Sequence, residues 1–202
     1  MHYFDVYHRH FARFRGRPVT IVEIGVFHGG SLQMWADYFG PRATIWGVDI
    51  DPRCLAFQEP GINVVQGDQS DREFLKRLAA QVGPIDLLID DGGHGMDQQI
   101  ITMEELYGGV AKNGTYFVED THTSYWAESY GGGYKRPGTF MEYSKNLIDQ
   151  LNAWHSESDS LRVDDFTRTT ASMHFYDSIV VFEKGEITKP LNRKTGRPSF
   201  SD

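Results

Sequence analysis

The sequence contains a single cysteine, Cys54, and no long apolar run. One cysteine cannot form an internal disulfide, so a reducing, cytoplasmic location is expected. Charged residues interrupt the longest apolar runs within about seven residues, whereas a membrane-spanning helix needs ~20 apolar residues. The first residues, MHYFDVYHRHFARF, mix charged and apolar side chains and do not resemble a signal peptide. These observations predict a protein that does not insert into a membrane.

Positive charge is also scarce. The 202 residues include 20 lysines and arginines against 28 aspartates and glutamates, a formal net charge of −8, and the isoelectric point is about 5.4. Because this balance repels a phosphate backbone, nucleic acid is not an expected partner. The length and the 40% content of hydrophobic residues are typical of one folded domain, which we expect to span residues 1–202.

Short apolar segments rich in β-branched residues alternate with segments of helical character. Five candidate strands end in glycine, isoleucine or an acidic residue: 19–25, 44–50, 62–68, 85–91 and 114–120. The candidate helices are 31–39, 70–82, 96–110 and 140–154. This alternation predicts an α/β fold with a doubly wound, mostly parallel, seven-stranded Rossmann-like sheet. Two further strand candidates, 171–176 and 178–184, flank Asp177 and are expected to form an antiparallel C-terminal hairpin.

The two ends of the chain have different character. Residues 1–17 are expected to be helical, and they carry aromatic side chains at near-helical spacing: Tyr3, Phe4, Tyr7, Phe11 and Phe14. This stripe is compatible with a homo-oligomer contact and equally with packing on its own domain. Residues 185–202 lack apolar periodicity and are expected to form a flexible tail.

Parallel sheets bind ligands beyond the carboxyl ends of their strands, so the strand ends are the places to search for a site. The first candidate strand leads into the turn Glu23–Ser31, where Gly25 and its neighbours allow a close approach of backbone to a ligand. Phe27 occupies a position at which a dinucleotide fingerprint has glycine, which disfavours nicotinamide and flavin cofactors.

The next two strands end in polar side chains suited to a nucleoside. Asp49 follows Gly25 by 24 residues, about where an acidic residue contacts ribose hydroxyls in nucleotide-binding units. The alternative role for Asp49 is a helix cap before Pro52. Asp68 and Gln69 end the third strand and are suited to an adenine edge, or form an ordinary turn.

The fourth and fifth candidate strands end in consecutive acids, Asp90-Asp91 and Glu119-Asp120. If the two strands are parallel neighbours, three carboxylates, those of Asp91, Glu119 and Asp120, meet at one rim and repel one another unless a cation lies between them. All-oxygen ligation favours a hard ion, Mg²⁺ first, with Mn²⁺ or Ca²⁺ as alternatives. The competing interpretation is that these acids cap helices and face water.

A histidine and a long loop follow these acids. His94 lies three residues beyond Asp91, and an imidazole titrates near neutrality as a general base should. Three other histidines near strand ends, His28, His122 and His174, remain alternatives. Residues 121–139 are long for a connector and carry Tyr125, Trp126, Tyr130 and Tyr134, which fit a lid that stacks on a ring, with core packing as the alternative for Trp126.

Together these motifs resemble a known family, the class I S-adenosylmethionine-dependent methyltransferases. More narrowly, they are similar to the metal-dependent sugar O-methyltransferases of macrolide biosynthesis and to related cephalosporin-pathway and rhamnosyl O-methyltransferase-like proteins. The resemblance covers roughly residues 17–184. The segments that carry it are Glu23–Ser31, Val48–Ile50, Ile89–His94, Val118–Thr121, Thr123–Trp126 and His174–Tyr176.

The resemblance implies a cofactor, a metal and roles for individual residues. It implies S-adenosylmethionine as methyl donor and Mg²⁺ as the metal, with His94 as the general base. The implied metal ligands are Asp91, Glu119 and Asp120, and the implied cofactor site consists of Glu23, Gly25, Asp49, Asp68 and Gln69, with Ser31 and Asp90 from the same strand ends.

The sequence therefore predicts an Mg²⁺-dependent O-methyltransferase that methylates a sugar hydroxyl in a natural product or glycan. The alternatives are methylation of a catechol-like phenol and a non-catalytic accessory protein that binds S-adenosylmethionine. In either enzyme the expected partner is a small glycosylated or diol substrate. The macrolide enzymes carry an additional N-terminal domain, whereas about 17 residues precede the first strand here, so neither the acceptor nor the oligomeric state follows from the resemblance.

Overall fold

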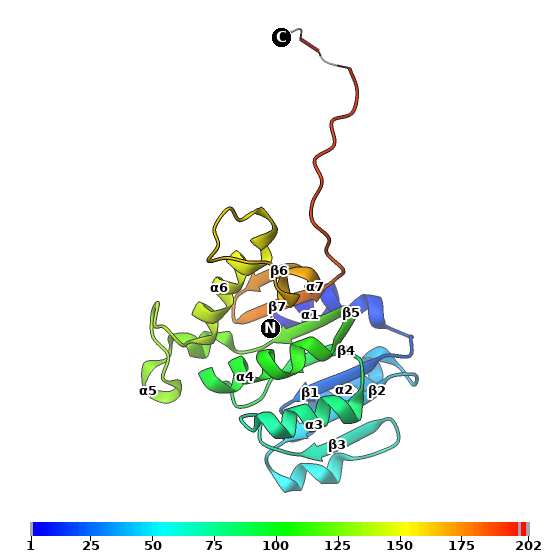
Figure 1. Cartoon of the computed structure of the whole chain (residues 1–202). Coiled ribbons are helices and arrows are strands. Elements are labelled where there is room, and N and C mark those ends of the chain that lie inside the picture. Colours follow the sequence, from blue (N-terminus) through cyan, green and yellow to red (C-terminus); the bar gives the residue numbers. More distant parts are fainter. Residues whose placement is uncertain (1, 198, 201–202) are drawn as a thin grey trace.

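The computed structural model describes residues 2–197 and 199–200. One seven-stranded sheet, in the order β3-β2-β1-β4-β5-β7-β6, runs through the molecule (Figure 1). The first five strands are mutually parallel, and β7 lies antiparallel between β5 and β6, which confirms the predicted fold class. The strands are β1 (Thr20–Ile24), β2 (Thr44–Asp49), β3 (Ile62–Gln66), β4 (Ile85–Asp90), β5 (Val110–Val118), β6 (Thr170–Tyr176) and β7 (Ile179–Lys184).

Helices cover both faces of the sheet. The α-helices are α1 (Tyr3–Phe11), α2 (Gly30–Phe39), α3 (Arg72–Val82), α4 (Met96–Leu106), α5 (Ala127–Tyr130), α6 (Phe140–Leu151) and α7 (Asp165–Thr169). Short 3-10 turns are η1 (Ala12–Phe14), η2 (Pro52–Phe57), η3 (Tyr107–Gly109), η4 (Thr121–Tyr125) and η5 (Ala153–His155). The crossover helices and the terminal hairpin lie where the sequence places them, within a few residues at each end.

Successive residues of each strand face opposite sides of the sheet and so belong to two separate cores. In β7, Ile179 and Val181 pack in the core under α1 and α2, whereas Val180 and Phe182 pack in the core under α3, α4 and α6. The same alternation continues past the ends of β1, β4 and β5. It therefore places Glu23, Asp91 and Glu119 on the face covered by α1 and α2, and Asp90 on the opposite face.

Two predicted boundaries are displaced. The helix expected over 96–110 ends at Leu106, because the glycines Gly108 and Gly109 lie in a 3-10 turn and carry no side chain to support a helix. The chain enters β5 at Val110, earlier than the expected start at residue 114.

The N-terminal aromatic stripe packs largely on its own domain. The Phe11 side chain is fully buried, with its ring centroid 5.6 Å from that of Trp35 and 5.1 Å from that of Phe117. The imidazole of His10 bonds through Nδ1 to Glu183 at 2.6 Å and through Nε2 to Tyr176 at 2.9 Å. These contacts fix α1 against β5, β6 and β7.

The described part of the C-terminal segment contains no helix or strand after Lys184 and extends away from the sheet (Figure 1). Its backbone remains tied to the domain as far as Ile187, whose N–H donates to the Arg168 carbonyl at 2.8 Å. Among the helices of the described residues, none is long and apolar enough to cross a lipid bilayer.

Candidate functional site

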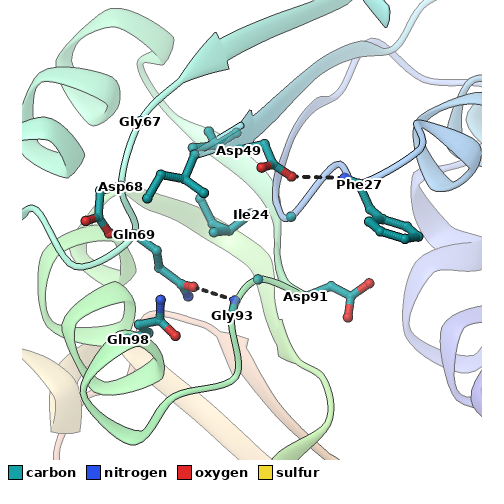
Figure 2. A pocket seen from close by; sticks show the side chains of 13 residues that line it. Ile24, Phe27, Asp49, Gly67, Asp68, Gln69, Asp91, Gly93 and Gln98 are labelled. Atoms are coloured by element: carbon teal, nitrogen blue, oxygen red, sulfur yellow. Dashed lines mark hydrogen bonds between the residues drawn. The ribbon is translucent and has the colours of Figure 1, made fainter. Parts of the chain in front are cut away.

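A cavity of about 240 Å³ opens beyond the carboxyl ends of β1, β2, β3 and β4 (Figure 2). Four of the residues predicted to bind a cofactor line it: Gly25, Asp49, Asp68 and Gln69. The remaining lining residues are Ile24, Phe27, Val48, Ile50, Gly67, Asp91, Gly92, Gly93 and Gln98. The position agrees with the rule that open parallel sheets bind ligands at this edge.

Asp49 holds the loop that follows β1. Its Oδ2 accepts the backbone N–H groups of Val26 and Phe27, each at 2.9 Å, and its Oδ1 accepts that of Asp51, also at 2.9 Å (Figure 2). Burial acts to raise the pKa of Asp49, but these three hydrogen bonds outweigh it and lower the pKa. The cap of the following 3-10 turn is Asp51, which accepts the Arg53 N–H, so the helix-cap alternative for Asp49 is wrong.

The loop after β1 passes very close to the loop after β4. A Cβ atom on Gly25 would lie 2.0 Å from the carbonyl oxygen of Asp91, and Gly25 has a φ of +99°, so only glycine fits. Phe27 also adopts a left-handed conformation, with φ +49°, and its side chain is 79% exposed. The backbone thus takes a glycine-like conformation at Phe27 while an aromatic ring projects beside the cavity.

Asp90 supports the cavity wall from behind. Its buried carboxylate accepts the Gln69 amide N–H at 2.6 Å and the Tyr116 hydroxyl at 3.0 Å. The Gln69 amide oxygen in turn accepts the N–H of Gly93 at 3.1 Å (Figure 2). Burial raises the pKa of Asp90 to about 6 against the opposing effect of its hydrogen bonds. Asp90 therefore acts on the cavity through Gln69.

Glu23 and Ser31 also lie behind the wall. The buried Glu23 carboxylate accepts the Ser31 hydroxyl at 2.9 Å and the indole N–H of Trp35 at 2.8 Å. Burial raises its pKa to about 8, although both hydrogen bonds act to lower it. Direct cofactor contact by Glu23, Ser31 or Asp90 stays a prediction, and in this structure the three residues support the strand-end loops.

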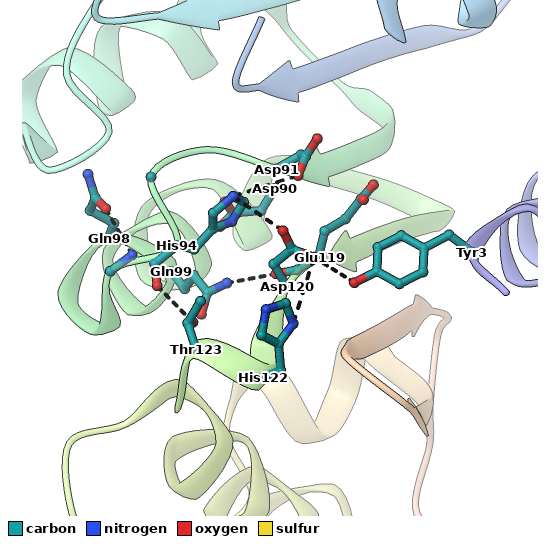
Figure 3. Close-up of polar contacts among 12 residues, drawn as sticks. Tyr3, Asp90, Asp91, His94, Gln98, Gln99, Glu119, Asp120, His122 and Thr123 are labelled. Atoms are coloured by element: carbon teal, nitrogen blue, oxygen red, sulfur yellow. Dashed lines mark hydrogen bonds and ion pairs between the residues drawn. The ribbon is translucent and has the colours of Figure 1, made fainter. Parts of the chain in front are cut away.

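A cluster of titratable side chains adjoins the cavity at the ends of β4 and β5. These strands are parallel neighbours, with Asp90 opposite Val118. Asp91, His94 and Asp120 offer ligand atoms that all lie within 4.8 Å of one another. The Nε2 atom of His94 lies 3.5 Å from Asp120 Oδ2 and 4.0 Å from Asp91 Oδ1 (Figure 3). We call these three residues the acid–histidine cluster.

Glu119 lies beside this cluster but is held by α1. Both of its carboxylate oxygens are 2.7 Å from the Tyr7 hydroxyl, and the residue is only 4% exposed. Burial raises the pKa of Glu119 well above its usual value, and the nearby charge of Asp91 adds to the rise. Tyr3, one turn earlier in α1, donates its hydroxyl to Asp120 Oδ1 at 2.5 Å (Figure 3).

The donor set fits a hard divalent cation. Within the described residues no donor hydrogen-bonds the Asp91 carboxylate, whose pKa rises to about 7 through burial and through the charges of Asp120 and Asp90. Carboxylate oxygens that repel one another and lack hydrogen-bond donors are suited to Mg²⁺, Mn²⁺ or Ca²⁺. The Asp91 carboxylate meets this description. Asp120 meets it at Oδ2, whereas its Oδ1 accepts the Tyr3 hydroxyl, and Glu119 is next to them.

His94 is placed by a left-handed turn. Its φ is +54°, and its carbonyl accepts the Thr123 hydroxyl at 2.9 Å. Burial lowers the pKa of His94, although the Asp120 charge opposes the shift, so the imidazole is neutral at pH 7. Its Nδ1 is buried without a hydrogen-bond partner in the described residues, while Nε2 faces the acids.

The alternative histidines differ in their distance from the acids. His122 is near, with Nδ1 3.9 Å from Asp120 Oδ1 and its ring against Trp126. His174 lies on β6, where its ring packs against the His10 ring and its Nε2 is hydrogen-bonded to the Ser172 hydroxyl. His28 borders a separate cavity beside Phe57. Of the three, His122 alone is within reach of the acid–histidine cluster.

The long loop over residues 121–139 is partly folded, as η4 and α5. Backbone hydrogen bonds from Gly132 N–H to the Trp126 carbonyl and from Gly133 N–H to the Ser124 carbonyl close it on itself. Trp126 is 49% exposed, so the core-packing alternative for this side chain is wrong. The role of the loop as a closing lid stays a prediction.

Sequence reasoning missed the two tyrosines that contact the acids. Tyr3 and Tyr7 stand out in the sequence only as part of an aromatic stripe. The available signal is that these two positions, one helical turn apart, carry hydroxyls, whereas Phe11 and Phe14 of the same stripe do not. A hydroxyl on a packing residue indicates a polar partner.

Comparison with known proteins gives close relatives. The chain is 38% identical over 190 residues to 8-demethyl-8-alpha-L-rhamnosyl tetracenomycin-C 2'-O-methyltransferase of Streptomyces olivaceus, a match over 90% of this chain and 50% of that protein. It is 36% identical over 198 residues to mycinamicin VI 2''-O-methyltransferase of Micromonospora griseorubida, over 92% of this chain and 49% of the relative. No family model matches the chain.

A solved structure agrees with these sequence matches. The methyltransferase MycE of the mycinamycin biosynthetic pathway, in complex with Mg and SAH, superposes with a TM-score of 0.83 at 36% identity, over 90% of this chain and 49% of that one. The chain thus spans about half the length of the relatives it matches.

Proposed function

Since this chain belongs to the class I S-adenosylmethionine-dependent methyltransferases, in the family of the macrolide and tetracenomycin sugar O-methyltransferases, we propose that it methylates a sugar hydroxyl of a glycosylated natural product. The observation that carries the proposal is the position of Asp91, which lines the strand-end cavity and also belongs to the acid–histidine cluster. If the cavity binds the cofactor and the cluster binds a cation, this shared residue would bring the methyl donor close to the acceptor.

S-adenosylmethionine is the proposed occupant of the strand-end cavity. Asp49 Oδ1 accepts one backbone N–H, which leaves a lone pair to accept a ribose hydroxyl. Asp68 and Gln69 lie at the end of β3, where the adenine edge would meet polar groups. The close approach of Gly25 to the Asp91 carbonyl keeps the loop after β1 free of side chains that would fill the site.

Asp91, Glu119 and Asp120 would hold the divalent cation, and the similar MycE methyltransferase has been crystallised with Mg and SAH. When bound, this cation supplies a positive charge that favours the ionised form of the acceptor hydroxyl. The tyrosine hydroxyls of α1 orient two of these carboxylates before any ligand arrives. Preorganised carboxylates cost less to bring together than mobile ones.

His94 is the proposed general base. Its Nε2 faces the side where the acceptor hydroxyl would lie, and a cation held by the neighbouring carboxylates would favour the tautomer with the proton on Nδ1 and the lone pair on Nε2. His94 takes the hydroxyl proton at Nε2 while the acceptor oxygen bonds to the methyl carbon and the bond from that carbon to sulfur breaks. S-adenosylhomocysteine and the methyl ether are the products.

The proposal is tested by methyl transfer to matched acceptors. A panel of 6-deoxyhexose glycosides and catechols is incubated with S-adenosylmethionine, with Mg²⁺ or with EDTA. We expect methylation of glycosides, loss of activity with EDTA and recovery when Mg²⁺ is restored. Methylation confined to catechols would overturn the sugar assignment. Failure to bind S-adenosylhomocysteine in calorimetry would overturn methyl transfer itself.

A further inference from the structure

A second recess, of about 300 Å³, lies between the first turns of α1 and α2. Its lining residues are Tyr3, Phe4, Tyr7, Gly30, Ser31 and Met34. We call it the α1–α2 recess. Three aromatic rings and a methionine make the recess apolar. The hydroxyl of Ser31 donates to Glu23 and so is not available to a ligand in the recess. Phe4 remains 50% exposed, so the recess presents apolar surface that a ligand would cover.

The recess shares its wall with the cation ligands. The Tyr3 and Tyr7 rings border it, while the hydroxyls of the same side chains donate to Asp120 at 2.5 Å and to Glu119 at 2.7 Å. One tyrosine side chain therefore separates an apolar surface from the acids. Figure 3 shows Tyr3 approaching the acids from the side of α1. A ligand bound at the acids would therefore lie across these tyrosine side chains from the recess.

We propose that the α1–α2 recess binds the apolar aglycone attached to the acceptor sugar. This inference rests on the proposed function. The relatives named above act on rhamnosyl tetracenomycin-C and on mycinamicin VI, and the first of these names describes a sugar attached to a second group. A site that receives such an acceptor needs a polar region for the sugar hydroxyls and an adjacent apolar region for the skeleton. The acids and the recess are such a pair.

The inference assigns a specificity role to Phe4 and Met34, which touch neither the acids nor the strand-end cavity. Burial of aglycone surface against these side chains strengthens binding of the whole glycoside. A bare sugar makes no contact with them. Their contribution must therefore depend on the group attached to the sugar.

The test compares two glycosides of the same 6-deoxyhexose, one with a methyl and one with a 4-nitrophenyl group, for each sugar that the wild-type protein methylates. We expect Phe4→Ala and Met34→Ala to raise KM for the 4-nitrophenyl glycoside by about tenfold, equivalent to 1.4 kcal/mol, and to leave KM for the methyl glycoside unchanged. Phe175→Ala is the matched control, because Phe175 is a similarly exposed aromatic residue, 40%, on β6. It should change neither value.

Binding of S-adenosylhomocysteine, measured by calorimetry for each variant, shows that the fold and the cofactor site are intact. Equal changes of KM for both glycosides, or no change for either, would overturn the aglycone site while leaving the proposed function standing. If no glycoside in the panel is methylated, the proposed function fails, and the aglycone site fails with it.

Discussion

The hydroxyl of Tyr7 lies 2.7 Å from both carboxylate oxygens of Glu119, across 112 residues of sequence. In the described residues this hydroxyl is the one hydrogen-bond donor to a carboxylate that is almost fully buried. A buried carboxylate without a donor is costly. The stability of the metal-free protein should therefore depend on Tyr7.

We predict that Tyr7→Phe lowers the free energy of unfolding by about 1–3 kcal/mol in EDTA, measured by urea denaturation. Saturating Mg²⁺ should recover part of the loss, because the positive charge of a bound cation stabilises the Glu119 carboxylate after its hydrogen-bond donor has been removed. Tyr107→Phe is the control: its hydroxyl is paired with the neutral Thr170 hydroxyl at 2.8 Å, so its cost should not respond to Mg²⁺. A loss in Tyr7→Phe that is identical with and without Mg²⁺ would argue against a link between Tyr7 and the cation site.

The carboxylates at the strand ends should destabilise the metal-free protein by mutual repulsion, although they are needed to bind the cation. Asp91→Asn removes one negative charge from beside Asp120 and Asp90, which disfavour the ionised form of Asp91. We expect this variant to unfold at higher urea concentration than wild type in EDTA at pH 8. We also expect it to lose Mg²⁺ binding in calorimetry and more than 90% of its methyl transfer. Asp68→Asn, outside the acid–histidine cluster, should keep Mg²⁺ binding; its loss there would place the cation elsewhere.

His94→Gln should separate catalysis from binding. General-base catalysis contributes about 10²–10⁴-fold in rate, so kcat should fall by that range while the affinity for S-adenosylhomocysteine stays within about twofold. His155→Ala, an exposed histidine in η5, is the control and should leave kcat unchanged. His122→Gln completes the set, and a larger loss of kcat in that variant than in His94→Gln would transfer the role of base to His122.

Glu23 gives the protein a pH-dependent stability that falls toward alkaline pH. Its pKa is raised to about 8 by burial, whereas a glutamate in an unfolded chain ionises near 4.3. Between these values the folded protein retains a proton that the unfolded chain has lost. The contribution of Glu23 to the free energy of unfolding is therefore fully present below about pH 4 and is lost as pH rises toward 8, at up to about 1.4 kcal/mol per pH unit.

Glu23→Gln should flatten this dependence and raise stability at pH 8, because its amide oxygen can still accept from Trp35 and its amide N–H can donate to Ser31. Urea denaturation in EDTA at pH 5, 6.5 and 8 measures the slope. Glu128→Gln, an exposed glutamate in α5, should reproduce the wild-type slope. If Glu23→Gln also reproduces it, burial of Glu23 does not control the pH dependence.

Much of the site is predictable from the sequence because it depends on regular geometry. Asp91 and Glu119 each lie two residues beyond an apolar residue, Ile89 or Phe117, that packs in the core under α1. Since side chains alternate along a strand, both acids share that face. The pairing of β4 with β5 then brings the strand ends together, as the order of the candidate strands indicates.

The remaining features depend on contacts that no local pattern records. Tyr7 meets Glu119 only after α1 has docked on the sheet, and the docking involves residues of β5, β6 and β7. Asp120 adopts a left-handed φ of +50°, which turns its side chain out of the strand alternation toward Tyr3. A non-glycine residue in this conformation is uncommon. Aspartate adopts it more often than most residues, but no local pattern distinguishes Asp120 from the other aspartates.

The docking of α1 also sets the order in which the protein can assemble during synthesis. The His10 imidazole of α1 binds Glu183 across 173 residues, so α1, which is synthesised before β7, has no complete docking surface until β7 emerges. Contacts of such long sequence separation form late in folding. A nascent chain that stops before β7 thus lacks the Glu183 partner of α1, and the docking that brings Tyr3 and Tyr7 to the acids is complete only once β7 has been synthesised.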